Sequence, residues 1–294
     1  MPLKFYIVDV FAEKKYAGNQ LAVFTEAAAL STEEMQQIAK EMNYSETTFI
    51  LSSQERDGGY DVRIFTPAKE LPFAGHPTLG TAFILQHAII QQPVETIVLN
   101  LKVGQIPVAI TYRDRRPDIL TMKQRPPIFG DVVTAATIAP VLNLDIADID
   151  SRFPIQEVST GVPFLIVPLK TLATLKRIKV NVDRLAEVVE SLQAKEVFVF
   201  CPETRNPANH FSARMFAPLL GIAEDPATGS ANGCFAGYLA QHNYLESALV
   251  DVRVEQGYEI GRPSLLLLKA QKQADIIEVS VGGNVILVAQ GEFV

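Results

Sequence analysis

The chain has 294 residues, of which 48% are hydrophobic and 20% are charged, so it can bury a sizeable core and is not disordered. Its net charge of −7 argues against a nucleic-acid partner or an anionic membrane surface. Because no apolar stretch is long enough to span a bilayer, we expect a globular protein of two domains with neither nucleic-acid nor membrane partners.

The first third of the chain combines short strand patterns with one amphipathic helix. A turn is predicted at Gly18 and Asn19, after the first strand. Ser31 and Glu34 have the spacing of a capping box and predict a helix over residues 32–42. Strand patterns occur at residues 5–11, 21–24, 47–51 and 60–65.

Two stretches are apolar or small on every side, at residues 77–90 and 228–242. A helix with no polar face must be buried all round. At about 1.5 Å per residue the first is roughly 20 Å long, too short for a membrane. Each lies among β-patterned segments such as residues 94–111 and 250–268. We therefore predict an α+β fold in which a curved, mostly antiparallel sheet or barrel wraps a central helix, built twice.

The chain also repeats itself in sequence. Residues 63–67 (Arg-Ile-Phe-Thr-Pro) return as residues 214–218 (Arg-Met-Phe-Ala-Pro). Each copy leads into a small-residue turn, at residues 74–80 and 227–231, and then into one of the apolar helices. The Gly-containing turn at residues 160–163 corresponds to Gly18 and Asn19. The pattern predicts two pseudo-symmetric halves, with a ligand held where the two turns face each other.

The second half adds surface elements. Residues 125–127 (Arg-Pro-Pro) mark a crossing between the halves, which we place at residues 1–116 and 117–282. The final strand, residues 283–294, is expected to pack with the first half or swap into it. Helices are predicted over residues 134–142 and 183–194, the second with Asp183 as its N-cap.

In the first half, two side chains are suited to proton transfer. Glu46 follows a helix and precedes apolar strand residues, where partial desolvation would raise its pKa toward neutrality. A surface glutamate at a loop end is the alternative. His76 stands between Gly75 and Pro77 at the start of a buried helix, whose positive end should keep the imidazole neutral. A packing or capping histidine is the alternative there.

In the second half, Asp225 opens the repeated turn, either as a functional carboxylate or as a plain helix cap. Gly229 and Ser230, with Thr228, supply backbone N–H groups and hydroxyls at a helix start, which suits an anion. Two such helix starts would hold a carboxylate and the charge that develops when a neighbouring carbon loses a proton.

The sequence lacks the motifs of several other kinds of enzyme chemistry. The chain has no Walker lysine, no dinucleotide fingerprint and no metal-ligand spacing, so no cofactor or metal is expected. Ser230, His76 and Asp225 could form a hydrolase triad, but no nucleophile-elbow context surrounds the serine. Cys201 and Cys234, the only cysteines, indicate a reduced, cytoplasmic protein. A thiol-dependent racemase using either one predicts inactivation by alkylation, yet Cys234 lies within an apolar helix and should be inert.

Several blocks, in order from the first strand to the last, resemble the phenazine-biosynthesis PhzF-like family. They are residues 18–19 (Gly-Asn), 45–49 (Ser-Glu-Thr-Thr-Phe), 63–67 (Arg-Ile-Phe-Thr-Pro), 71–77 (Leu-Pro-Phe-Ala-Gly-His-Pro), 224–231 (Glu-Asp-Pro-Ala-Thr-Gly-Ser-Ala) and 256–264 (Gln-Gly-Tyr-Glu-Ile-Gly-Arg-Pro-Ser). The resemblance implies a diaminopimelate-epimerase-like fold with C-terminal strands exchanged between the halves, an active site in the cleft between them, and a homodimer.

The resemblance also implies a function. The type enzyme isomerises trans-2,3-dihydro-3-hydroxyanthranilate without a cofactor, and the matched positions assign proton shuttling to Glu46 and supporting or binding roles to His76, Asp225 and Ser230. In related epimerases two cysteines act as acid and base, and Ala74 and Ala227 are matched to them, which disfavours a two-thiol racemase. We therefore expect an isomerase acting on a small carboxylate substrate, bound by the backbone of Gly75 and Gly229; a non-catalytic binding or regulatory protein that keeps the cleft is the alternative.

Overall fold

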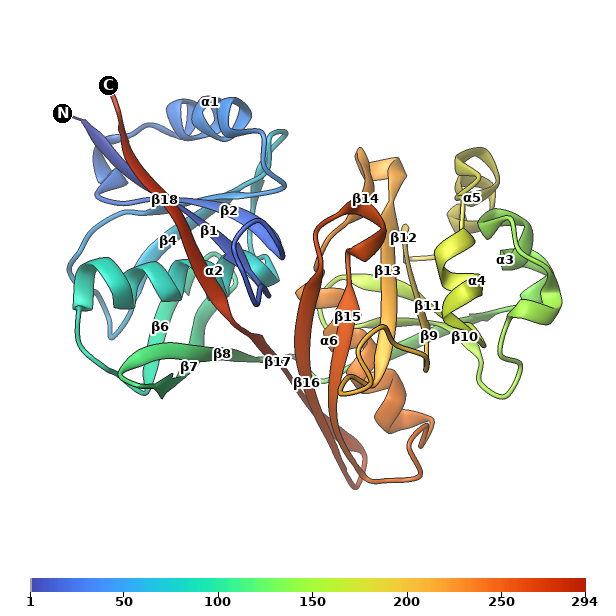
Figure 1. Ribbon diagram of the computed structural model, residues 1–294. Coiled ribbons are helices and arrows are strands. Elements are labelled where there is room, and N and C mark those ends of the chain that lie inside the picture. Colours follow the sequence, from blue (N-terminus) through green and yellow to red (C-terminus); the bar gives the residue numbers. More distant parts are fainter. Residues whose placement is uncertain (1) are drawn as a thin grey trace. The chain divides into compact units, whose positions relative to one another are not determined.

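The computed structural model describes residues 2–294 and divides into two compact units. Unit 1 comprises Met1–Met122 with Gly282–Val294, and unit 2 comprises Lys123–Val281. The boundary expected after residue 116 falls where strand β8 (Arg116–Gln124) begins, and the units divide later, after Met122. The last strand, β18 (Val285–Phe293), pairs antiparallel with the first, β1 (Leu3–Val10), so both belong to unit 1 (Figure 1).

Unit 1 contains one mostly antiparallel sheet in the order β18–β1–β2–β3–β4–β6–β7–β8, with the short β5 paired to β4. Only the β2–β3 and β4–β6 pairs among them are parallel. The remaining strands are β2 (Asn19–Phe24), β3 (Thr47–Ile50), β4 (Tyr60–Phe65), β5 (Glu70–Leu71), β6 (Thr96–Leu101) and β7 (Gly104–Arg113).

The central helix of unit 1 is α2 (Gly75–Ile84), and all of its residues are buried. It contacts strands β1, β2, β3, β6, β7 and β18, so the sheet wraps it as the apolar pattern predicts. Gly80 allows this close packing, since a Cβ there would lie 2.6 Å from the side chain of Leu21. The helix continues as a π-helical segment, η2 (Leu85–Ile90), which the sequence did not indicate.

The helix α1 (Thr32–Met42) covers the outside of unit 1 beside the short η1 (Ala27–Ala29). The predicted capping box is present: Glu34 N–H donates to Ser31 Oγ at 3.2 Å, and Ser31 N–H donates to Glu34 Oε2 at 2.7 Å. These bonds satisfy N–H groups that a helix start otherwise leaves unpaired, which is why the helix begins here.

Unit 2 repeats this plan, in the order β9–β10–β11–β12–β13–β15–β16 with β14 paired to β13. The β11–β12 and β13–β15 pairs are parallel, at the same places as the parallel pairs of unit 1. Its strands are β9 (Ile128–Val133), β10 (Ile155–Ser159), β11 (Pro163–Pro168), β12 (Glu196–Cys201), β13 (Phe211–Ala217), β14 (Ile222–Asp225), β15 (Leu249–Gln256), β16 (Ser264–Gln273) and β17 (Ile276–Gly283).

The central helix of unit 2 is α6 (Gly229–Gln241), which contacts strands β10, β11, β15 and β16. Strands β1 to β5, α2 and β6 to β8 therefore correspond, in order, to β10 to β14, α6 and β15 to β17. The edge strand of each sheet follows the other repeat in the chain: β18 comes after β17, and β9 comes after β8. The predicted α+β fold of two similar halves is thus confirmed.

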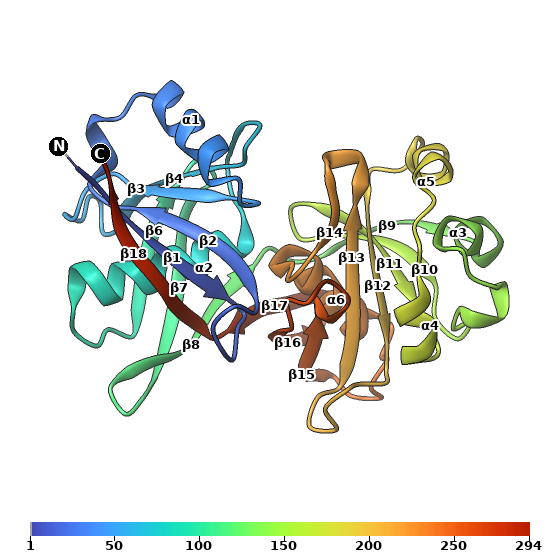
Figure 2. The same cartoon turned by 45° about the horizontal axis from the view of Figure 1, so that its top comes forward.

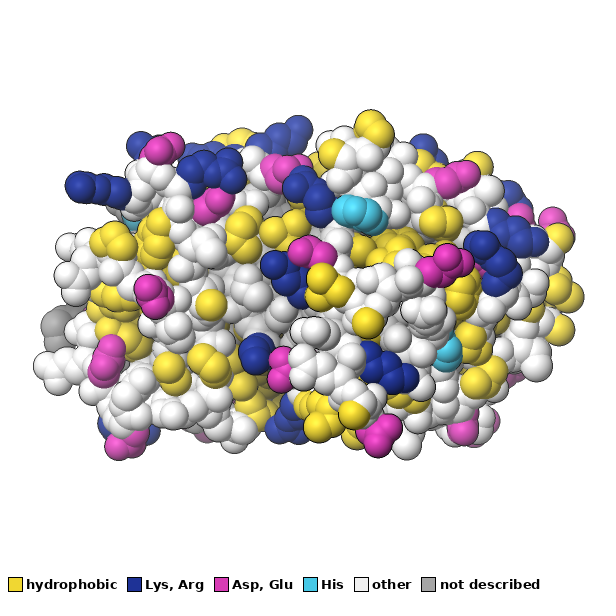
Figure 3. All heavy atoms as spheres, turned by 90° about the horizontal axis from the view of Figure 1, so that it is seen from below, with side chains coloured by type: hydrophobic (Ala, Val, Ile, Leu, Met, Phe, Trp, Pro, Cys, Tyr) yellow, Lys and Arg dark blue, Asp and Glu magenta, His cyan; other side chains and the backbone are white. Residues whose placement is uncertain are grey.

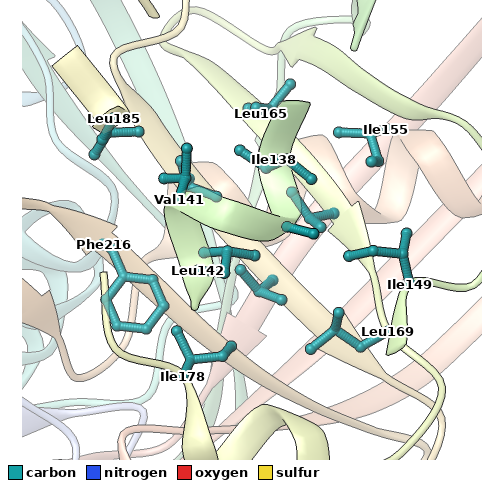
Figure 4. Close-up of a cluster of buried hydrophobic side chains, with 14 of the residues drawn as sticks. Ile138, Val141, Leu142, Ile149, Ile155, Leu165, Leu169, Ile178, Leu185 and Phe216 are labelled. Atoms are coloured by element: carbon teal, nitrogen blue, oxygen red, sulfur yellow. The ribbon is translucent and has the colours of Figure 1, made fainter. Parts of the chain in front are cut away.

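Three helices lie on the other side of the unit 2 sheet from α6 (Figure 2): α3 (Ala135–Leu142), α4 (Leu172–Arg177) and α5 (Val182–Val189). Their apolar residues pack on β11 and β12 in the cluster drawn in Figure 4, which includes Ile138, Leu165 and Leu185. Short turns of 3₁₀ helix complete the unit: η3 (Ile146–Asp148), η4 (Pro218–Leu220) and η5 (Tyr258–Ile260).

The expected helix over residues 183–194 is wrong in both bounds. Asn181, not Asp183, is the N-cap of α5, because its Oδ1 accepts the N–H of Arg184 at 3.1 Å. The helix ends at Val189, and the Lys195 ammonium donates to the backbone carbonyl of Leu192 at 2.8 Å beyond that end. The carbonyls that follow the helix are satisfied by a side chain, so the helix stops early.

Acidic and basic side chains are interspersed on the surface seen in Figure 3 rather than gathered by sign. Among the described residues, no helix is both long enough and apolar enough to cross a membrane.

Candidate active site

An arginine–glutamate pair marks the equivalent point of both repeats. Arg63 donates to both carboxylate oxygens of Glu70 at 2.8 Å, and Arg214 donates to those of Glu224 at 2.9 and 2.6 Å. The central helices begin at the same spacing after these glutamates. Gly75 therefore corresponds to Gly229, and His76 to Ser230.

This correspondence corrects one sequence match. The N-cap of α2 is Ala74, and the N-cap of α6 is Thr228, so Thr228 rather than Ala227 occupies the position equivalent to Ala74. The sequence match aligned the alanines of the two turns, whereas the structure aligns the turns by the first residues of the two helices. A threonine hydroxyl is no thiolate, so the argument against a two-thiol racemase is unchanged.

In unit 1 the structure brings Glu46 and His76 together. Glu46 precedes β3, His76 lies in the first turn of α2, and 3.4 Å separates Glu46 Oε2 from His76 Nε2. The two side chains are 15% and 6% exposed, so the alternative of a surface glutamate is excluded. The Thr81 hydroxyl donates to that of Thr48 at 2.8 Å, which holds the start of β3 against α2.

The His76 imidazole is neutral. Burial lowers its pKa to about 3, while a hydrogen bond with the backbone of Gln20 acts in the opposite direction. The neutral form was predicted from the helix end, but desolvation is the larger cause. The short separation from Glu46 is therefore a carboxyl–imidazole contact and not an ion pair.

The Gln20 bond also orients the ring. A backbone group raises a histidine pKa by accepting a proton from the ring, so the Gln20 carbonyl is the acceptor. The neutral ring has one N–H donor and one acceptor nitrogen. Nε2, which has no hydrogen-bond partner among the described residues, is then the acceptor nitrogen facing Glu46. Such an arrangement can steady a carboxyl group in both its protonation states.

In unit 2, Asp225 ends β14 and lies beside the start of α6. It is 6% exposed, and its carboxylate accepts a hydrogen bond from the hydroxyl of Thr228. Because the Thr228 hydroxyl is used in this way, it does not cap α6, and Ala74 has no side chain able to cap α2. Both central helices thus begin with N–H groups that no N-cap side chain satisfies, which favours an anion there.

Gln256 secures the same turn, a role that sequence reasoning missed. Its amide donates to the Asp225 carbonyl at 2.9 Å, and its Oε1 accepts from Asn232 at 2.9 Å and from the N–H of Thr228 at 3.3 Å. Gly257 follows with φ 77°, and a Cβ there would lie 2.5 Å from the Pro226 carbonyl. The Gln-Gly block was recognised in the sequence, but only its contacts reveal what it holds.

Gln124 supports α6 from the other direction. Its amide donates to the Gly229 carbonyl at 2.9 Å, and its Oε1 accepts from the Thr160 hydroxyl at 2.7 Å. Gly233 leaves room for this side chain, since a Cβ there would lie 1.8 Å from Gln124 Oε1. The predicted residues Asp225, Gly229 and Ser230 are therefore gathered at one helix start, held by polar side chains from distant strands.

The other histidines have structural contacts. His242 Nε2 lies 2.9 Å from Gln156 Oε1 at the end of α6, and His87 stacks on Phe83. The backbone N–H of Arg253 donates to His210 Nδ1 at 3.1 Å. In the described part of the chain, no group of three or more His, Cys, Asp and Glu side chains could hold a metal ion.

Both thiols are expected to resist alkylation in the folded protein. Burial raises the pKa of Cys201 to about 11 and that of Cys234 to about 12, and both side chains are buried. The reactive thiolate is therefore scarce near neutral pH. Iodoacetamide at pH 7.5 should leave activity and intact mass unchanged over hours, while both cysteines react in urea. Rapid loss of activity with one modified thiol would instead favour the thiol-dependent racemase.

Two wrapped helices whose starts carry polar residues define a class of fold found among amino-acid racemases and epimerases. The fold is similar to that of a hydroxyproline epimerase from Agrobacterium vitis, with a TM-score of 0.65 at 11% identity over 99% of this chain and 91% of that one. At this identity the likeness concerns the fold alone.

The chain belongs to the PhzC-PhzF family of phenazine biosynthesis-like proteins, whose family model matches residues 8–291. It is 34% identical over 289 residues to the trans-2,3-dihydro-3-hydroxyanthranilate isomerase of Pseudomonas aeruginosa, with 98% of each chain covered. A PhzF-family phenazine biosynthesis protein from Bacillus anthracis has a TM-score of 0.92 at 27% identity, covering 100% of this chain and 99% of that one. These relatives support an isomerase.

Proposed function

We propose that this protein is a cofactor-independent isomerase that moves a proton on a small carboxylate-bearing molecule, with Glu46 as the acid–base group. The observation that carries the proposal is the carboxyl of Glu46 lying 3.4 Å from a buried, neutral His76 at the start of α2. The 34% identity to an isomerase of trans-2,3-dihydro-3-hydroxyanthranilate supports a related substrate class.

In the proposed reaction, the Glu46 carboxylate takes a proton from one carbon of the substrate, and the C–H electrons pass into the adjacent π system. The protonated carboxyl then returns that proton to another carbon, so one C–H bond breaks, another forms, and no electrons are gained or lost. His76 accepts a hydrogen bond from the protonated carboxyl through Nε2 and keeps it oriented. A neutral imidazole suits this role, since a cation would hold Glu46 ionised.

The start of each central helix is suited by itself to binding a carboxylate. In unit 1 the backbone N–H groups of Gly75 and His76 offer donors, and in unit 2 those of Gly229 and Ser230 do so with the Ser230 hydroxyl, each at the positive end of a helix dipole. These groups would also stabilise the charge that develops as the proton leaves. Asp225, held by Thr228 and Gln256, positions the substrate beside the start of α6.

The test is proton exchange in D₂O. The protein is incubated with trans-2,3-dihydro-3-hydroxyanthranilate and with a panel of hydroxy- and amino-cyclohexadiene carboxylic acids, and the products are read by NMR and mass spectrometry. We expect isomerisation of at least one acid, with deuterium at one carbon. Thermal stabilisation by an acid without deuterium incorporation would favour the alternative of a binding protein.

A further inference from the structure

Strand register places a second glutamate at the position of Glu46. Thr47 pairs with Phe65 in unit 1, and Val197 pairs with Phe216 in unit 2. Phe65 and Phe216 occupy the same place in the repeated Arg-x-Phe motif, so Thr47 corresponds to Val197. The preceding residues are Glu46 and Glu196.

The parallel strand pairs β2–β3 and β11–β12 also match Thr47 with Val197. Ala22 of β2 pairs with Thr47, and Leu165 of β11 pairs with Val197. Local sequence hides this equivalence: Thr47 and Thr48 follow Glu46, whereas Val197 and Phe198 follow Glu196. Both repeats therefore carry a carboxyl group immediately before the third strand of the repeat, β3 in unit 1 and β12 in unit 2.

Hydrogen bonds hold the chain just before Glu196 in place. Glu157, which is 4% exposed, accepts the backbone N–H of Ala194 at 2.6 Å through Oε1 and that of Asp131 at 3.3 Å through Oε2. Lys195, next to Glu196, directs its ammonium to the carbonyl of Leu192 at 2.8 Å. The backbone and side chain of the two residues before Glu196 are thus held by hydrogen bonds.

The surroundings of Glu196 contain a second acidic group. Its register partner on β11 is Phe164, β14 places Asp225 close enough to interact electrostatically, and α6 contributes Cys234. Burial, together with the Asp225 charge, raises the pKa of Glu196 to about 7. Cys234 is a neutral thiol, so the charge that acts on Glu196 here is that of Asp225.

The arginine of the repeated Arg-x-Phe motif in unit 2 is already engaged. Arg214 donates to both oxygens of Glu224 and to the carbonyl of Leu175 at 3.0 Å. In unit 1 the position equivalent to Asp225 is Leu71, since Leu71 pairs with Ile64 as Asp225 pairs with Met215. Of these two described positions, unit 2 has Glu196 and Asp225, whereas unit 1 has Glu46 and Leu71, so the neighbouring acidic group distinguishes Glu196 from Glu46.

We propose that Glu196 is a second functional acid of this enzyme, which keeps its proton beside Asp225 and donates a hydrogen bond to an anionic oxygen of the substrate at the start of α6. The inference rests on the proposed function, in which this helix start binds a carboxylate. Two ionised carboxyls here would repel such a substrate, whereas one proton removes a negative charge and supplies a donor.

The activity test is a pH–rate profile. Glu196 is protonated below about pH 7 and ionised above it, so kcat/KM of the wild-type protein should fall as pH rises through about 7. Glu196→Ala should lose about 10- to 100-fold in kcat/KM at pH 6, the loss expected for one hydrogen bond to a charged group. Glu196→Gln keeps an N–H donor and does not ionise. Its kcat/KM at pH 6 should lie between those of the wild-type protein and Glu196→Ala, and it should not decline as the pH rises.

Two controls separate a functional role from a structural one. Glu187→Gln makes the same substitution at an exposed position of α5 and should keep the wild-type profile. Thermal unfolding of each variant reports whether it is folded. An alkaline decline that persists in Glu196→Gln would overturn the proposal, as would wild-type kcat/KM in Glu196→Ala.

A binding experiment distinguishes failure of this inference from failure of the proposed function. Anthranilate, an aromatic amino acid that cannot be isomerised, is titrated calorimetrically from pH 6 to pH 8. Its affinity should weaken with rising pH in the wild-type protein and stay level in Glu196→Gln, whether or not any acid is turned over. The same pH dependence in both proteins would contradict the role of Glu196 alone. Absence of anthranilate binding at every pH would contradict the carboxylate site on which both proposals rest.

Discussion

Replacing Glu46 with glutamine is expected to lower kcat by about 10²- to 10⁴-fold, the contribution typical of a positioned general acid–base group. Glutamine has nearly the same shape as glutamate and can still lie against His76, but it neither takes up nor returns a proton. The folded structure and anthranilate binding should therefore persist. Turnover, deuterium incorporation in D₂O, the thermal midpoint and calorimetric binding measure these four properties.

Glu41→Gln is the matched control, because Glu41 lies in the same unit on the exposed face of α1. It should retain wild-type turnover. Near-full activity of Glu46→Gln would remove this residue from the mechanism. Loss of activity together with a large fall in the thermal midpoint would mean that Glu46 acts through folding.

Replacing Arg214 with methionine is expected to destabilise the protein by about 3–5 kcal/mol, the cost of leaving a buried carboxylate without its partner. The Arg214 and Glu224 side chains are only 9% and 8% exposed, and Arg214 also satisfies the carbonyls of Leu175 and Ile178. Urea unfolding followed by circular dichroism measures the effect.

The equivalent ion pair of unit 1, Arg63 with Glu70, provides a comparison for Arg214→Met. Arg63→Met removes the equivalent guanidinium of unit 1, where Glu70 keeps the Lys102 ammonium at 2.6 Å and Arg63 is 22% exposed. Arg63→Met should lose less unfolding free energy than Arg214→Met, since Glu70 retains a cationic partner and more solvent reaches the pair. Equal losses in the two variants would show that burial and the second partner do not decide the cost.

Much of the architecture could be predicted because it depends on local pattern. The apolar residues of α2 and α6 have no polar face, so each helix needs a sheet around it, and the capping box of Ser31 and Glu34 sets the start of α1. The wrong N-cap predicted for α5 also concerns local pattern. Asn181 and Asp183 are both good caps, and only the backbone conformation at Asn181 decides between them.

The candidate site was predicted in part. Glu46 and His76 were chosen from their local settings and from the family resemblance, and their contact agrees with that choice. Thr228 was expected to offer its hydroxyl to an anion, whereas the structure directs that hydroxyl to Asp225. Gln256 was not assigned a role, and Glu196 was not considered. Glu196 begins an ordinary apolar strand, and neither Val197 nor Phe198 repeats the threonines that follow Glu46.

The amino-acid sequence by itself determined the duplication, the two buried helices and the residue types at their starts, because these follow from periodicity, capping and composition along the chain. Tertiary structure alone decided the pairing register, since register depends on contacts between residues far apart in sequence. It also decided which groups keep their protons. Burial lowers the pKa of His76 and raises that of Glu196, and burial is a property of the folded surroundings rather than of the residue.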